Sequence, residues 1–139
     1  MNNIEKYPQY QLYLFTLKLL TLKDQLIPKN CDEWCINATI INRAYYSSYL
    51  YCELWLDETK KFHVKHPWDF TDGEEQIGEH KQIRDALFDF GERNMKSELQ
   101  NLATLRKIAD YNPFQDIMPR EVIKAIEHMK KIFNHLKFE

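Results

Sequence analysis

Two short stretches of the chain combine arginine with tyrosine or with a carboxylate. Arg43 and Tyr46 are three residues apart within a run of aromatic side chains, and Arg106 and Asp110 are four residues apart. At these spacings the members of each pair lie on one face of a helix. Guanidinium groups match the geometry of phosphate oxygens, so two arginines brought together would form an anion site. An Arg43–Asp110 ion pair between two packed helices would instead be a structural clasp that fixes their register.

The spacing of apolar residues predicts the helices that carry these side chains. Apolar residues recur every three or four positions, as on the buried face of a helix. The second helix is apolar on several sides and is expected at the centre, and Phe15 and Phe90 are expected to face inward. With few glycines and no strand pattern, the sequence predicts an all-α, up-and-down bundle of about five helices, in one domain over residues 1–139. The predicted helices are residues 8–27, 32–57, 79–93, 95–111 and 119–136, with an irregular stretch at 58–78.

Several residues mark the ends of these helices. Pro8 and Pro119 suit the first turn of a helix, because their missing N–H groups would be unpaired there. Asp32 is a helix-capping residue type at the start of the second helix. Pro113 disfavours a helical conformation at the residue before it and is expected to end the fourth helix.

Composition restricts the classes of function. The formal net charge is −2, so the chain as a whole has no electrostatic preference for nucleic acid, and any such site must be a local patch. No run of about eighteen apolar residues occurs and no signal peptide follows Met1, so we expect a cytoplasmic protein that does not enter membranes. The cysteines and the two histidines of the irregular stretch match no zinc-binding pattern, and neither a metal nor a cofactor is expected.

Three stretches resemble, in their order, the HEPN superfamily. They are Arg-Ala-Tyr-Tyr at 43–46, His80-Lys81, and Leu-Arg-Lys-Ile-Ala-Asp-Tyr at 105–111, and the resemblance covers roughly residues 10 to 135. The resemblance implies an up-and-down helical bundle that commonly forms a homodimer. Many members are metal-independent ribonucleases of toxin–antitoxin, CRISPR-associated or antiphage systems, often encoded beside a nucleotidyltransferase.

The chain departs from the family at the position of its catalytic histidine. Nuclease members carry arginine, four to six residues and then histidine, whereas Arg106 is followed at those places by Tyr111, Asn112 and Pro113. Cleavage of RNA by its own ribose hydroxyl needs an acid or base with a pKa near neutrality, and tyrosine titrates near 10. An imidazole could come from His80 instead. The residues expected in the site are Arg106, Tyr111 and His80 for catalysis, and Arg43, Tyr46, Asp110 and Asn112 for holding RNA or another anion.

Two functions therefore remain open. The first is a HEPN-like protein that binds or cleaves RNA in a prokaryotic defence or toxin–antitoxin module. The second is a non-catalytic module that binds a protein or a nucleotide, in which the Arg/Asp cluster is structural. A further basic stripe on the last helix could follow a phosphate backbone, although such a stripe is more often a solvated face; its members are Lys124, His128, Lys131 and His135.

Overall fold

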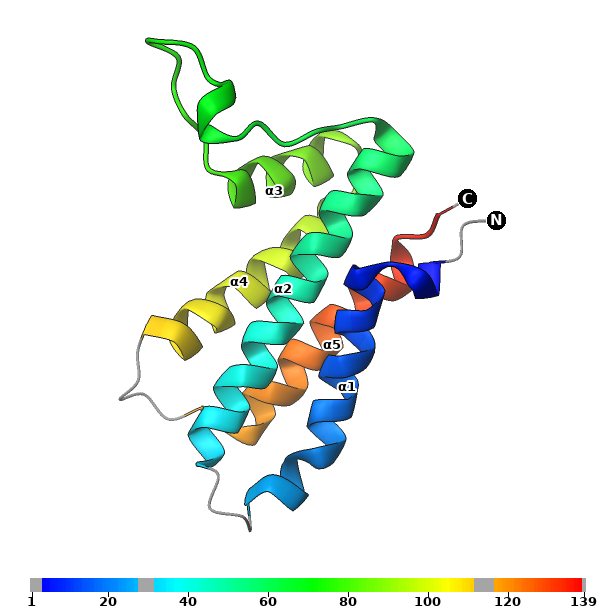
Figure 1. The fold of residues 1–139 in the computed structure, drawn as a ribbon, viewed down its shortest axis with the longest axis vertical. Helices are drawn as coiled ribbons and strands as arrows, with labels where there is room; N and C mark the ends of the chain where they lie inside the picture. Colours follow the sequence, from blue (N-terminus) through cyan, green and yellow to red (C-terminus); the bar gives the residue numbers. More distant parts are fainter. Residues whose placement is uncertain (1–3, 28–31, 112–116, 139) are drawn as a thin grey trace.

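The chain folds as a helical bundle (Figure 1). A computed structural model describes residues 4–27, 32–111 and 117–138, and these contain helices and loops but no strand. Long helices run alongside one another, and a shorter one, Glu79–Asp89, lies across one end (Figure 1). The predicted all-α architecture is confirmed. The elements are η1 (Ile4–Lys6), α1 (Pro8–Leu26), α2 (Glu33–Lys60), η3 (Pro67–Asp69), α3 (Glu79–Asp89), α4 (Arg93–Tyr111) and α5 (Pro119–His135).

The starts of three helices follow the predicted signals. Pro8 and Pro119 are the first residues of α1 and α5. Asp32 caps α2, since its Oδ1 accepts a hydrogen bond from the backbone N–H of Trp34 at 2.7 Å. This bond pairs one of the N–H groups that the first turn leaves without an intrahelical partner. The predicted end of the fourth helix at Asn112 lies outside the described residues.

The third helix is shorter than predicted. It ends at Asp89 rather than Arg93, because Gly91 adopts a left-handed conformation with φ of +85°. The N–H of Glu92 then donates to the carbonyl of Leu87 at 2.7 Å, which closes the helix end. The chain reverses over this turn, and α4 begins at Arg93, two residues before the predicted start. The turn therefore brings α4 back into contact with α3.

Helix α2 is the centre of the fold, as predicted. It contacts α1, α3, α4 and α5. Three of its buried polar side chains bond to backbone carbonyls at the two ends of α5: Asn37 to Ile117 at 3.0 Å, Tyr51 to Leu136 at 2.6 Å and Trp55 to Lys137 at 3.0 Å. These bonds fix the position of α5 along one face of α2, while another face of α2 meets α3 and α4.

Two side chains that were expected in the core are exposed. Phe15 was predicted inward, but α1 carries leucines on all sides and Thr16 is its fully buried residue. When a helix is apolar all round, the spacing of its leucines does not identify the buried face. Phe90 lies one residue beyond the end of α3, so the turn at Gly91 directs it outward. Both predictions are wrong. None of the described helices is both long and apolar enough to cross a bilayer.

Candidate anion site between helices α2, α3 and α4

Arg106 lies at the centre of a cluster of tyrosines. Its Nη2 donates to the hydroxyl of Tyr46 at 2.9 Å and its Nη1 to the hydroxyl of Tyr111 at 3.4 Å. Its Cζ is 5.2, 5.3 and 5.6 Å from the ring centroids of Tyr45, Tyr46 and Tyr111. Aromatic faces attract a guanidinium, so the rings hold this cation in one place. Its side chain is 13% exposed, which leaves part of the group accessible.

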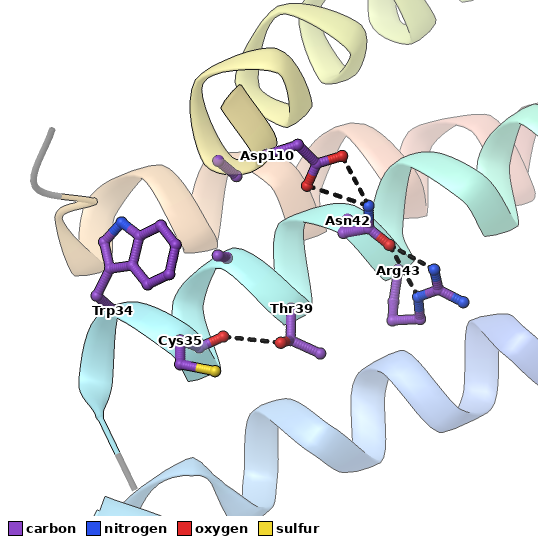
Figure 2. Close-up of a pocket in the computed structure, with 8 residues that line it drawn as sticks. Trp34, Cys35, Thr39, Asn42, Arg43 and Asp110 are labelled. Carbon is purple, nitrogen blue, oxygen red and sulfur yellow. Dashed lines mark hydrogen bonds between the residues drawn. The ribbon is translucent and has the colours of Figure 1, made fainter. Parts of the chain in front are cut away.

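One side of Arg106 is joined to Asp110 and, through Asn42, to Arg43. Arg106 Nε is 3.5 Å from Asp110 Oδ2. The side-chain amide of Asn42 donates to both carboxylate oxygens of Asp110, at 3.0 and 3.2 Å, and its Oδ1 accepts from Arg43 Nε at 3.1 Å and from Arg43 Nη2 (Figure 2). The order of contacts is therefore Arg43, Asn42, Asp110, Arg106.

The direct Arg43–Asp110 ion pair, one of the two arrangements considered from the sequence, does not form, because Asn42 lies between the two side chains. Asn42 and Tyr46 are four residues apart on α2, and they meet Asp110 and Arg106, which are four apart on α4. Each residue of an α-helix is turned by about 100° from the one before it, so Arg43 lies to the side of this contact. Asn42 thus occupies the position between the helices that had been assigned to Arg43.

The cavity beside Arg43 has mixed walls. It has a volume of about 480 Å³ and is lined by Trp34, Thr39, Arg43 and Asp110, among others (Figure 2). Its lining includes one arginine, Arg43, and one carboxylate, Asp110. This side of the cluster therefore has no net preference for an anion.

A second pocket, on the other side of Arg106, is strongly basic. Its volume is about 170 Å³, and its lining comes from α2, α3 and α4. His80 enters it from the first turn of α3 and stacks on Tyr49, with ring centroids 4.1 Å apart and planes 9° apart. His80 Nδ1 also forms a hydrogen bond with the hydroxyl of Tyr45. The lining residues are Tyr45, His80, Arg84, Ala103, Arg106 and Lys107, with three permanent cations and no carboxylate.

The protonation of this pocket follows from burial and from its arginines. Burial, and then the positive charges of Arg106 and Arg84, lower the pKa of His80 below its usual value of 6.5, while Glu79 opposes this shift. Burial raises the pKa of Tyr45 to about 12, although Arg84 and Arg106 act in the opposite direction. At neutral pH the imidazole is therefore neutral and the phenol protonated. A neutral imidazole can accept a proton from a bound ligand.

Most of the predicted site residues come together. His80 and Arg106 line the same pocket, Tyr46 and Tyr111 bond to Arg106, and Asp110 contacts Arg106 from the other side. Arg43 contacts the cluster through Asn42. Asn112 lies outside the described residues.

Three polar members of the cluster were missed by sequence reasoning. Arg84 follows His80 by four residues on α3, a spacing that could have identified it. Lys107 adjoins Arg106, and Asn42 precedes Tyr46 by four residues. The spacing of four was a signal for Arg84 and Asn42, but not for Lys107, and it can be used only once the contacting helices are known.

The basic stripe on α5 is largely neutralised by carboxylates of the α3–α4 turn and of α4. His128 Nδ1 bonds to Glu98, Lys131 Nζ is 3.7 Å from the same carboxylate, and His135 Nε2 is 2.8 Å from Glu92. Three of the four stripe residues thus have acidic partners. The stripe is the polar face of an amphipathic helix, the interpretation favoured from the sequence.

No protein-family model matches this chain, and neither does any curated protein or solved structure. The case for a function therefore rests on the chemistry of the site.

Proposed function

We propose that this chain is a HEPN-like protein that binds RNA at the basic pocket and cleaves it without a metal. The observation that carries the proposal is that Arg84, Arg106 and Lys107 surround the neutral His80 in one pocket without a carboxylate. Guanidinium and ammonium groups would hold a phosphate, and the imidazole would lie beside it as an acid or base. The proposal includes the homodimer and the nucleotidyltransferase partner that the family resemblance implies.

In the proposed reaction the ribose 2′-hydroxyl attacks the adjacent phosphorus. The tautomer of His80 in which Nδ1–H donates to the Tyr45 oxygen leaves the lone pair on Nε2 to accept the hydroxyl proton. The bond from phosphorus to the 5′ oxygen breaks, and that oxygen takes a proton from solvent or from the Tyr111 hydroxyl. The products are a 2′,3′-cyclic phosphate and a 5′-hydroxyl end. Arg106 would stabilise the negative charge that develops on the phosphoryl oxygens.

The alternative is a non-catalytic module in which the arginines are structural. It is favoured by the chain of contacts Arg43–Asn42–Asp110–Arg106, which joins α2 to α4 and places a carboxylate beside Nε of Arg106. If Arg106 is only structural, its removal lowers stability and nothing else. If it also binds phosphate, its removal weakens RNA binding or cleavage as well.

Cleavage of labelled total RNA and tRNA in EDTA tests the proposal. We expect the wild-type protein to cut RNA, and Arg106→Ala and His80→Ala to lose the activity. Arg106→Lys keeps one charge but cannot form the same set of bonds, so it should bind RNA yet cleave slowly. Circular dichroism shows which variants remain folded. If folded wild-type protein at micromolar concentration neither cuts nor binds RNA, the non-catalytic alternative holds.

A further inference from the structure

A second cavity lies beside α3 and α4, the two contacting helices that also line the basic pocket. This second cavity has a volume of about 310 Å³ and is lined by Phe88 of α3 and by residues of the first half of α4. On α3, His80 and Arg84 line the first cavity and Phe88 the second, at steps of four residues. On α4 the lining residues also recur at steps of three and four, so they form one stripe: Arg93, Lys96, Gln100, Ala103 and Lys107. We call the two cavities together the α3–α4 groove.

The α3–α4 groove concentrates positive charge in a chain whose net charge is −2. Its permanent cations are Arg84, Arg93, Lys96, Arg106 and Lys107, and no carboxylate lines either cavity. Among the described residues, Arg106 is the member of this set that has a carboxylate within ion-pairing distance. The other four cations have no carboxylate within 4.0 Å in the part of the chain that the structure describes.

Helix α4 separates charges of opposite sign between its faces. On the side that meets α5, Glu98 is paired with His128 and Lys131. A pocket beside α3 has four carboxylates in its lining, from Glu74, Glu75, Asp85 and Asp89, of which Glu74 is paired with Lys65 and Asp85 with Lys81. Acidic residues thus lie on neighbouring surfaces, and none lines the groove itself.

One exposed aromatic ring, that of Phe88, lines the groove, and a second, that of Tyr111, lies beside Arg106. Phe88 is 51% exposed, and Lys96 Nζ lies 5.1 Å from its ring centroid. Tyr111, at the other end of α4, is 72% exposed. The bases of a single strand stack on such rings while cations beside them hold its phosphates, and this arrangement accepts many sequences. In a duplex the bases stack on each other, so they are not free to stack on an exposed phenylalanine.

We propose that the α3–α4 groove is the track along which single-stranded RNA lies, with a phosphate between Arg84 and Lys107 beside His80 and a base on Phe88. This inference rests on the proposed function, and it adds the form of the substrate and the path that it takes. The helical rise places Arg93 and Lys107 about 21 Å apart along α4, the length of roughly six stacked nucleotides. Contacts to several phosphates follow from that length.

Fluorescence anisotropy with an unstructured, labelled 12-nucleotide RNA at several salt concentrations tests the track. Lys96→Ala should lower the magnitude of the salt slope by about 0.7, the contribution of one phosphate contact on a single strand. Gln100→Glu, which places a carboxylate in the middle of the groove, should weaken binding, and Phe88→Ala should weaken it about fivefold or more. The matched controls are Lys124→Ala on α5 and Gln25→Glu on α1, exposed positions away from the groove, which should bind as wild type.

The outcomes separate the track from the proposed function. If wild type binds RNA and Arg106→Ala reduces binding or cleavage, while the Lys96, Gln100 and Phe88 variants behave like their controls, the track is wrong and the function stands. If wild type binds no RNA, both fail. If polyglutamate competes as well as RNA and Phe88→Ala changes nothing, the groove serves an acidic protein partner, and the RNA track is overturned.

Discussion

The side-chain amide of Asn42 on α2 donates hydrogen bonds to both oxygens of the Asp110 carboxylate on α4, at 3.0 and 3.2 Å. Because Asp110 lies 3.5 Å from Arg106 on the same helix, this contact sets the position of the central arginine relative to α2. Asn42 is thus a positioning residue for the candidate site, although it carries no charge. Its removal should affect both stability and the site.

Asn42→Ala should lower the free energy of unfolding by about 1 to 2 kcal/mol, because hydrogen bonds to a charged group are lost. Asn101→Ala is the matched control, since Asn101 lies in the middle of α4 and is exposed, with the same gain in helix propensity. Urea denaturation of both variants measures the difference. Equal stability of the two variants would show that the contact with Asp110 contributes nothing.

The low pKa of His80 makes stability depend on pH. The unfolded imidazole takes up a proton near pH 6.5, whereas the folded one does so at lower pH. As pH falls through this interval the unfolded state binds more protons, so the folded state loses stability, and the loss is complete below the folded pKa. When the pH is lowered from 7.5 to 5.5, the free energy of unfolding should fall less in His80→Phe than in wild type. The phenylalanine ring can still stack on Tyr49.

Urea denaturation at the two pH values measures that difference, and the comparison with the variant removes the contribution of the other histidines. Titration of the ring by NMR gives the pKa directly. Arg106→Ala should move it upward, because one of the positive charges that depress it is removed. A ring that titrates at or above 6.5 in the wild-type protein would contradict the account of the pocket.

The prediction of the elements succeeded where one residue type determines local geometry. Pro8, Asp32 and Pro119 begin or cap helices through their own backbone or side chain, and all three act as predicted. The prediction failed where contacts between helices decide which side chain is buried or which partner it meets. The burial of Phe15 depends on which side of an evenly apolar helix meets α2, and the choice of Asn42 over Arg43 depends on how α2 and α4 are rotated against each other. The spacing of residues along one helix shows neither which side of that helix meets a neighbour nor how two helices are rotated against each other.

Tyr51→Phe should destabilise the protein by about 1 to 3 kcal/mol. The Tyr51 hydroxyl is buried and donates to the Leu136 carbonyl at 2.6 Å, so its removal leaves that carbonyl without this donor. Tyr111→Phe makes the same chemical change at an exposed ring and should change stability little. Thermal melts followed by circular dichroism compare the two. A melting temperature that falls equally in both variants would rule out a special role for the Tyr51 bond.

Gly91→Ala should cost about 1 to 2 kcal/mol, because an alanine at φ of +85° brings its Cβ too close to the backbone. Gly78→Ala is the control: Gly78 has φ of −60°, and its replacement should change stability by no more than about 0.5 kcal/mol. Nothing lies within 4 Å of a Cβ at either position, so packing of the new methyl group does not contribute to the difference in stability. Urea denaturation of the pair isolates the backbone effect.

The three hydrogen bonds between α2 and the ends of α5 also govern the order of events during synthesis. They join residues 80, 82 and 85 positions apart, whereas most contacts within a helical bundle are local. At about 5 to 20 residues per second, a ribosome takes roughly 4 to 15 seconds to progress from the end of α2 to the end of α5. Throughout that interval the apolar face of α2 lacks its partner. The separation of these two helices in sequence therefore sets how long this apolar face of α2 stays exposed on the nascent chain.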